Sequence, residues 1–197
     1  MAKYTRFLFA LLVLGTLSIA SAAVVDFNSF TTTTPAETLV STGGLDFTYS
    51  GASFMYVWCC NSPNGNGTPA LILSGFSAGD QVAITRTGGG AFDLNSFEMA
   101  ISWYYTTSPD TVDVTAFFQG GGSSGQTLTL FNAPLQTYNL NLMNVTEVDV
   151  TKLLATNNAY WVMDNVTYNG GAVPEPASLS LIGVGLIGLG LRFRRRK

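Results

Sequence analysis

The stretch that decides the fold is residues 137–150, TYNLNLMNVTEVDV, in which apolar and polar side chains alternate in two runs, 139–142 and 147–150. Leu140 and Leu142 alternate with asparagines, and Val148 and Val150 alternate with acidic residues. Because successive side chains of a β-strand point to opposite faces, this pattern predicts strands with one buried and one solvated face. No neighbouring part of the chain shows a sustained helical period.

Similar runs, rich in Thr, Val, Phe, Tyr and Trp, recur along the chain between clusters of Gly, Asn and Ser. The predicted strands are residues 24–27, 45–49, 54–58, 70–73, 81–86, 92–105, 112–118, 127–131, 137–143, 145–150 and 160–168. Many short strands within the length of one domain predict an all-β fold, a two-sheet antiparallel sandwich resembling a jelly roll. An immunoglobulin-like sandwich is the alternative.

Composition separates this body from the two ends of the chain. The 197 residues are 47% hydrophobic and 11% charged, but the long apolar blocks lie only at residues 7–19 and 177–191. The body, residues 24–172, has two basic residues against eleven acidic ones, a formal charge of −9. Such an acidic body argues against binding to nucleic acid, which needs clustered Lys and Arg.

The chain contains no histidine. This excludes Ser-His-Asp and Cys-His catalysis as well as zinc sites with histidine ligands. Acidic residues are numerous, but none are spaced as a recognisable catalytic pair, so we predict that the protein is not an enzyme. A hydrolase acting on glycosides through two carboxylates is kept as an alternative.

The first 23 residues are typical of a secretory signal peptide. Lys3 and Arg6 precede the apolar block at residues 7–19, and small residues follow at 20–23, as signal peptidase requires. An uncleaved membrane anchor is the alternative, but the block is short for a span. We therefore expect export, cleavage by signal peptidase, and a folded domain at residues 24–172.

The last 25 residues, 173–197, contain three parts in a fixed order. Val173, Pro174, Glu175 and Pro176 form a stiff, extended segment, and an uncharged block follows at residues 177–191. The chain closes with a basic cluster made of Arg192, Arg194, Arg195, Arg196 and Lys197. As a helix the block rises about 22 Å, less than the roughly 30 Å of a bilayer core, so it predicts a temporary stop-transfer tether.

These three parts resemble the PEP-CTERM sorting signal of Gram-negative bacteria, with Pro174, Glu175 and Pro176 as its triplet. The resemblance implies recognition by an exosortase, a membrane-embedded cysteine protease-transpeptidase. It also implies transient insertion in the inner membrane, cleavage near the triplet, and delivery to the cell surface or extracellular matrix. A simple single-span anchor is the alternative.

Two segments of the body also resemble ectodomains of this family. They are AFDLNSFEMA at residues 91–100 and YWVMDNVTY at residues 160–168, and both favour a jelly roll. The family is associated with exopolysaccharide and biofilm matrix. The resemblance therefore implies a structural or adhesive role linked to exopolysaccharide, with a carbohydrate-binding module as the alternative.

Three side chains are candidates for a structural calcium site. Asp26 lies on the first predicted strand, and Asp164 and Asn165 lie on the last. First and last strands of a jelly roll are commonly neighbours, and Ca²⁺ prefers carboxylate, amide and carbonyl oxygens. The alternative is that these residues are ordinary hydrogen-bonding groups at strand edges, and no cofactor is required by the sequence.

Cys59 and Cys60 are adjacent and are the only cysteines of the chain. Export delivers them to an oxidising compartment, where a disulfide between neighbours would rigidify the following Gly/Asn loop. Intermolecular bridging and two thiols on opposite faces of a strand are the alternatives.

Aromatic residues near the strand ends are candidates for contact with glycans. Rings with a polar group suit both protein cores and sugar-binding surfaces, and the alternative is that most of these rings belong to the core. The candidates are Tyr56, Trp58, Trp103, Tyr104, Tyr105, Tyr160 and Trp161, of which we single out Trp103, Tyr105 and Trp161. Adjacent rings on a strand point to opposite faces, so one member of the pair at residues 160 and 161 is expected to face outward.

Overall fold

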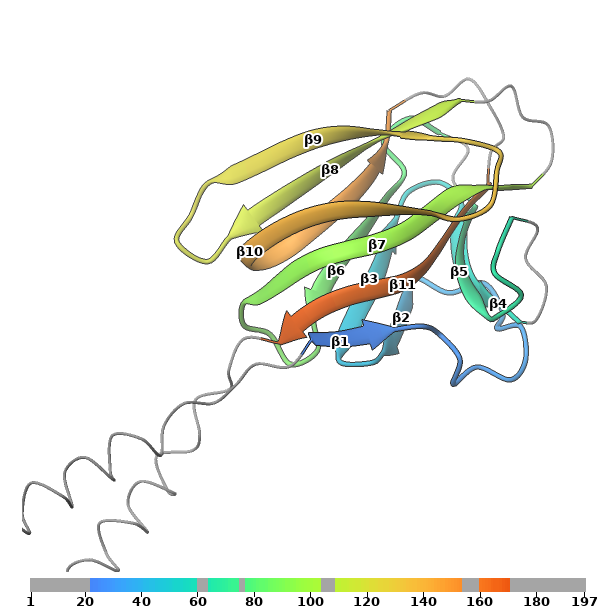
Figure 1. Cartoon of the computed structure of the whole chain (residues 1–197), viewed down its shortest axis with the longest axis horizontal. Helices are drawn as coiled ribbons and strands as arrows, with labels where there is room; N and C mark the ends of the chain where they lie inside the picture. Colours follow the sequence, from blue (N-terminus) through green and yellow to red (C-terminus); the bar gives the residue numbers. More distant parts are fainter. Residues whose placement is uncertain (1–21, 60–63, 75–76, 104–108, 154–159, 171–197) are drawn as a thin grey trace, which may run out of the picture. The chain divides into compact units, whose positions relative to one another are not determined.

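The computed structural model describes residues 22–59, 64–74, 77–103, 109–153 and 160–170, and these form eleven β-strands (Figure 1). The strands are β1 (Ala22–Val25), β2 (Leu39–Thr42), β3 (Leu45–Ser50), β4 (Phe54–Trp58), β5 (Ala70–Ser74), β6 (Gln81–Arg86), β7 (Phe92–Trp103), β8 (Asp110–Phe118), β9 (Ser123–Leu130), β10 (Gln136–Lys152) and β11 (Tyr160–Gly170). In these ranges no helix is long and apolar enough to cross a membrane.

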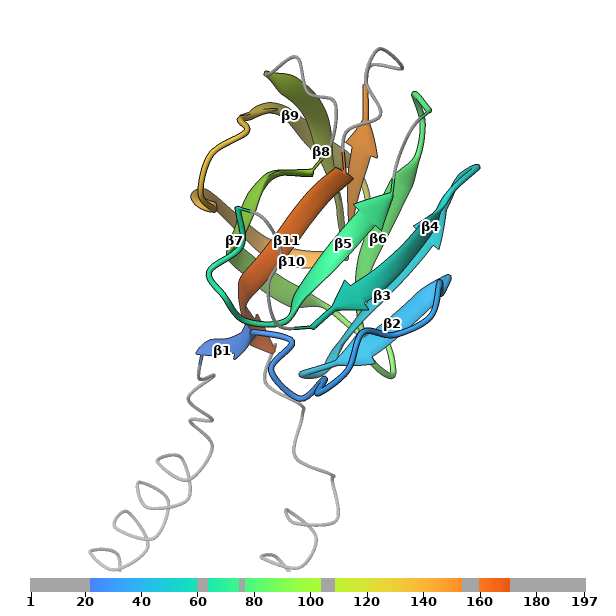
Figure 2. The ribbon, with the colours of Figure 1, turned by 90° about the vertical axis from the view of Figure 1, so that its right-hand side faces the viewer.

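The strands form two antiparallel layers that share the long strand β10 (Figures 1 and 2). The first half of β10 pairs with β7, which continues through β11 to β5 and β4, and β1 also pairs with β11. The second half of β10 lies between β6 and β8, and the layer continues to β3 and β2 on one side and to β9 on the other. The predicted all-β antiparallel sandwich is therefore confirmed.

Bulges allow β10 to pass from one layer to the other. Asn141 and Asn144 have positive φ values of 51° and 58°, and the register against β7 shifts on both sides of Leu142. A bulge of this kind bends a strand and increases its twist. The two strands predicted at residues 137–143 and 145–150 are therefore wrong in count, because the bulges bend one strand without ending it.

The hydrophobic core lies between the layers. Phe27, after β1, packs on Phe47 of β3 with ring centroids 5.3 Å apart, and both rings are buried. Met99 of β7 and Val148 of β10 are fully buried in the same cluster. The alternation noticed in the sequence thus places one face of each strand into this core.

Strand boundaries differ from the prediction at a few places. β1 begins at Ala22, inside the predicted signal peptide, because its first residues pair with β11. Strand β2 was not predicted, since its four residues are too few to show a pattern. The rest of the signal peptide, and the sorting segment with Val173, Pro174, Glu175 and Pro176, lie outside the described residues.

Candidate functional site

The candidate site is the outer face of the layer that contains β4, β5, β11 and β7. We use "outer face" for the side chains that these four strands direct away from the core. They are Phe54, Tyr56 and Trp58 of β4, Ala70 and Ile72 of β5, Tyr160, Val162 and Asp164 of β11, and Glu98 and Ala100 of β7. Their inward neighbours, such as Met55, Leu71 and Met163, are fully buried. Strict alternation along all four strands therefore produces this second, aromatic and polar surface.

A row of aromatic rings occupies the edge of the outer face. Ring centroids of Phe54 and Tyr56 are 5.8 Å apart, and those of Tyr56 and Trp58 are 6.0 Å apart. Phe54 is 41% exposed, whereas Tyr56 and Trp58 are half-buried. Such rings, with a hydroxyl or indole N–H beside an apolar surface, suit stacking against a flat ligand.

Tyr160 of β11 adds a further ring to the row. Burial, and then the proximity of Tyr160, raise the pKa of Tyr56 to about 12. Both rings pack against the small cluster of Ala70, Ile72 and Val162. Tyr56 therefore stays protonated at physiological pH and keeps a hydroxyl that can both donate and accept hydrogen bonds.

Residues 64–68, which precede β5, lie over the centre of the outer face. The Nδ2 atom of Asn64 donates to the carbonyl of Ile101 at 2.8 Å, and Leu135 N donates to the carbonyl of Asn64 at 3.0 Å. Asn66 Nδ2 and Thr68 Oγ1 each donate to Asp164 Oδ2 at 3.0 Å. These bonds explain why apolar side chains on an outward face are buried.

Asp164 is the buried charge of the site, with no exposed surface. Burial raises the pKa of its carboxyl to about 6, although hydrogen bonds from Asn165 N, Thr68 and Asn66 counteract this effect and Glu98 adds to it. Its Oδ1 atom accepts the backbone N–H of Asn165 at 2.8 Å. Both oxygens of Asp164 are therefore used within the protein.

Glu98 bonds both to Asn165, the neighbour of Asp164, and to a residue at the protein surface. Its Oε2 accepts from Asn165 Nδ2 at 2.8 Å, and its Oε1 accepts from the hydroxyl of exposed Thr137 at 3.3 Å. Asn165 has a φ of 47° and lies at a register shift between β11 and β7, so the bulge directs its amide toward Glu98. The outer face thus combines aromatic rings with a network of hydrogen-bonding groups.

The residues predicted to bind calcium make hydrogen bonds within the protein, and their binding of calcium stays a prediction. The neighbouring position of the first and last strands is confirmed, because Val25 of β1 is opposite Val166 of β11. Asp26, however, accepts from the backbone and side chain of Asn28, while both oxygens of Asp164 are bonded as described above. Across the described ranges no group of three His, Cys, Asp or Glu side chains could hold a metal ion.

Of the three glycan contacts singled out from the sequence, Trp161 is the one whose side chain the structure describes. Trp161 is 2% exposed and faces the core, where its indole N–H donates to Asp110, so Trp161 is wrong as a surface contact. The side chains of Trp103 and Tyr105 lie outside the described residues. The prediction that one ring of the pair at residues 160 and 161 faces outward is confirmed.

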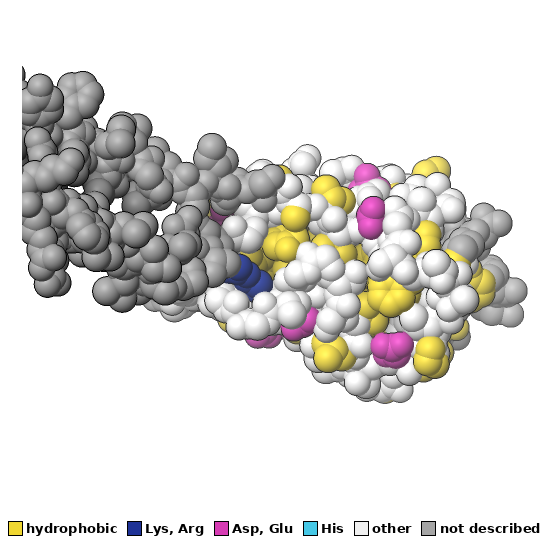
Figure 3. All heavy atoms as spheres, turned by 90° about the horizontal axis from the view of Figure 1, so that it is seen from below, with side chains coloured by type: hydrophobic (Ala, Val, Ile, Leu, Met, Phe, Trp, Pro, Cys, Tyr) yellow, Lys and Arg dark blue, Asp and Glu magenta, His cyan; other side chains and the backbone are white. Residues whose placement is uncertain are grey.

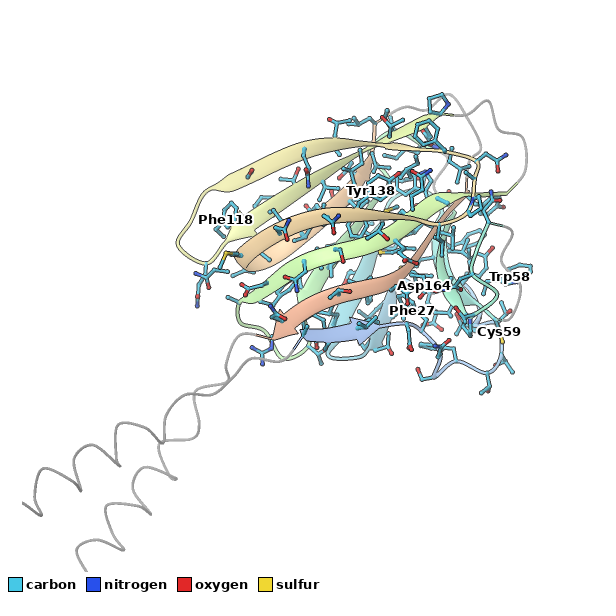
Figure 4. All side chains as sticks on the ribbon, in the orientation of Figure 1. Phe27, Trp58, Cys59, Phe118, Tyr138 and Asp164 are labelled. Atoms are coloured by element: carbon cyan, nitrogen blue, oxygen red, sulfur yellow. The ribbon has the colours of Figure 1, made fainter. Side chains whose placement is uncertain are left out.

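Other residues of the site were not singled out from the sequence. Asn66 and Thr68 carry no local signal, because residues 64–68 meet Asp164 only in the folded domain. Glu98 is placed opposite Asp164 by the pairing of β7 with β11. Cys59, which the sequence had singled out, follows Trp58 at the end of β4 (Figure 4). It is disulfide-bonded. Cys60 lies outside the described residues, so its pairing with Cys59 stays a prediction.

Comparison with protein families identifies the end of the chain. Residues 172–196 match the model of the PEP-CTERM protein-sorting motif. This range contains the Pro174-Glu175-Pro176 triplet, the apolar block and most of the basic cluster. The motif implies export and sorting to the cell surface by an exosortase. No curated protein matches the chain in sequence.

Comparison with solved structures concerns the β-sandwich. An exo-β-agarase matches with a TM-score of 0.51 and 11% identity over 80% of this chain, and the match spans only 26% of the agarase. A family 29 carbohydrate-binding module from Piromyces equi matches with a TM-score of 0.43 and 10% identity, covering 83% of this chain and 99% of that chain. A second such module, a mutant complexed with mannohexaose, matches with a TM-score of 0.45 and 15% identity over 78% and 94%. The agarase match shows a shared fold alone.

Proposed function

We propose that this chain is an exported, non-catalytic surface protein of a Gram-negative bacterium, whose β-sandwich binds polysaccharide of the extracellular matrix through the outer face. In this proposal the C-terminal segment tethers the chain to the inner membrane until an exosortase cleaves it. The sorting motif at residues 172–196 supports the route, and the aromatic outer face supports the ligand. The role is structural or adhesive, as suits a protein of the biofilm matrix.

The row of Phe54, Tyr56 and Trp58 carries the proposal. Three consecutive outward positions of one strand are aromatic, and the rings contact one another along the strand. Apolar faces of sugar rings stack on such surfaces, while the hydroxyl of Tyr56 and the carboxylate of Glu98 can bond to sugar hydroxyls.

The distribution of charge favours a neutral glycan over an acidic one. Between residues 24 and 172 the only basic residues are Arg86 and Lys152, and Lys152 is 1% exposed. Arg86 is on β6, in the other layer, and on the face seen in Figure 3 the colour of Lys and Arg appears at a single spot. An outer face whose charged groups are carboxylates would repel uronic acids and sulfated sugars.

Binding to the outer face is tested by affinity electrophoresis in gels that contain neutral or acidic polysaccharides. We expect retardation by neutral polysaccharide, and Trp58→Ala should reduce it at least tenfold because a stacking surface is lost. Phe117→Ala is the matched control, since Phe117 is 38% exposed on β8 of the other layer. Equal retardation of the two variants, or no retardation of the parent protein by any glycan, would contradict the proposal.

The route is tested by mass spectrometry of the mature protein from its host. We expect an N-terminus near Ala23 and a C-terminus near Pro174–Ala177 in the surface fraction. An intact basic cluster at the C-terminus of surface-resident protein would contradict processing by an exosortase. Replacement of Glu175 by Ala should leave the unprocessed chain in the membrane fraction.

A further inference from the structure

Asp110 and Lys152 form a buried pair inside the core, away from the outer face. Asp110 is the first residue of β8 and Lys152 is the last residue of the neighbouring strand β10, where Val112 is opposite Lys152. Each residue is only 1% exposed, and Lys152 Nζ lies 3.4 Å from Asp110 Oδ2. An amine and a carboxyl group are thus held next to each other without access to water.

Hydrogen bonds fix the carboxyl group of Asp110 and the backbone of Lys152. Asp110 Oδ1 accepts the backbone N–H of Thr111 at 2.8 Å, and Oδ2 accepts the indole N–H of Trp161 at 3.2 Å. The amine lies 5.8 Å from the centroid of the Trp161 ring. The backbone of Lys152 is fixed as well, because its N–H donates to the carbonyl of Asp80 at 2.8 Å and its carbonyl accepts from Gly79 at 2.9 Å.

We propose that Lys152 and Asp110 condense to an intramolecular amide after the domain folds. The ammonium proton first moves to the carboxylate, which leaves a neutral amine beside a carboxylic acid. The Nζ lone pair attacks Cγ of Asp110, the C–N bond forms, and one carboxyl oxygen leaves with two protons as water. No oxidation or reduction occurs, and the step needs no co-reactant.

The two hydrogen-bond donors are placed to assist this step. As Nζ attacks, negative charge develops on the carboxyl oxygens, where the N–H groups of Thr111 and Trp161 already point. Holding two reactants in contact replaces a bimolecular encounter by an intramolecular one, which is worth several orders of magnitude in rate. A lysine amine in an apolar pocket is a competent nucleophile once it is neutral.

The amide is favoured over the ion pair, because its formation removes two buried charges. A buried ion pair carries a desolvation cost that its mutual attraction repays only in part, whereas an amide is neutral. The expelled water joins bulk solvent. The product would link the end of β10 covalently to the start of β8, and would suit a domain exposed to proteases and mechanical load outside the cell.

The test is the mass of the folded, full-length chain, measured after denaturation and reduction. We expect a mass lower by one water molecule than the mass calculated from the sequence of that same chain. An endoproteinase that cuts after glutamate separates Asp110 from Lys152, because Glu147 lies between them. The fragment of residues 99–147 and the fragment that begins at Val148 should nevertheless remain joined, and trypsin should not cut after Lys152.

Variants identify the bond. Lys152→Met should restore the full mass, while Asp113→Asn, a change at a carboxylate on the same strand, should keep the loss of one water and the joined fragments. If Lys152→Met does not fold, the fragment test on the parent protein decides alone. A full parent mass, separated fragments, or a loss of water located in a single fragment would overturn the proposal.

Discussion

Acidification should stabilise this domain, because two buried carboxyls bind protons more tightly when the chain is folded. Burial raises the pKa of Asp164 to about 6 from 3.8, with Glu98 adding to the shift. The pKa of Asp149 is likewise raised to about 6, by burial and then by neighbouring Glu147, while Gln81 lowers it. One carboxylate oxygen of Asp149, Oδ1, is buried without a hydrogen-bond partner.

The sign and size follow from proton linkage. Between about pH 4 and pH 6 the folded state holds protons that the unfolded state has lost, so the free energy of unfolding increases as pH falls. From pH 7 to pH 5 each carboxyl contributes about 1 kcal/mol, and the two together about 2 to 3 kcal/mol. The gain is complete once the pH falls below the pKa of the unfolded chain.

Urea unfolding at pH 7 and pH 5, followed by tryptophan fluorescence, measures this difference. Asp164→Asn should remove about half of the pH dependence, because the amide does not titrate, and Asp149→Asn should remove the other half. A parent protein that is no more stable at pH 5 than at pH 7 would refute the reasoning. So would an Asp164→Asn variant that keeps the full dependence.

Two further predictions concern the packing of β11. Gly44→Ala should destabilise the domain more than Gly89→Ala, by about 1 kcal/mol or more, in the same urea assay. Both glycines have φ near +84°, but a Cβ at Gly44 would meet the hydroxyl of Tyr168, which donates to the carbonyl of Gly43, whereas the space at Gly89 is open. Equal losses would contradict this explanation. Trp161→Phe should cost about 1 to 3 kcal/mol, because the buried side-chain oxygen of Asp110 loses the indole donor, and an unchanged urea midpoint would show that this bond contributes nothing.

Much of the fold could be predicted because its signal is local. Alternation at residues such as Val82 and Ile84 depends only on the period of a strand, and both are buried in the core as expected. The interruption at Asn144 was predicted as the end of a strand, and the bulge at Asn141 was missed because this residue looks like an ordinary polar position of an alternating run. Whether an asparagine continues a strand or bends it depends on the strand paired with it.

The candidate site was harder to predict, since its residues meet through long-range pairing. Tyr160 and Trp161 are adjacent, and the sequence required only that one of them face outward. Trp161 faces inward because Asp110, on a distant strand, accepts its indole hydrogen. Val162 is buried on the outward side as well, so hydrophobicity along β11 could not distinguish the two faces.

By itself the sequence determined the all-β class, the acidic body and the sorting motif, since strand period, charge and the order of a short terminal motif are properties of neighbouring residues. The tertiary structure alone decided that Asn66 and Thr68 lie over the outer face and that Asp110 meets Lys152 in the core. The reason is physical: alternation specifies which side chains share a face, but the pairing of distant strands specifies what that face contacts.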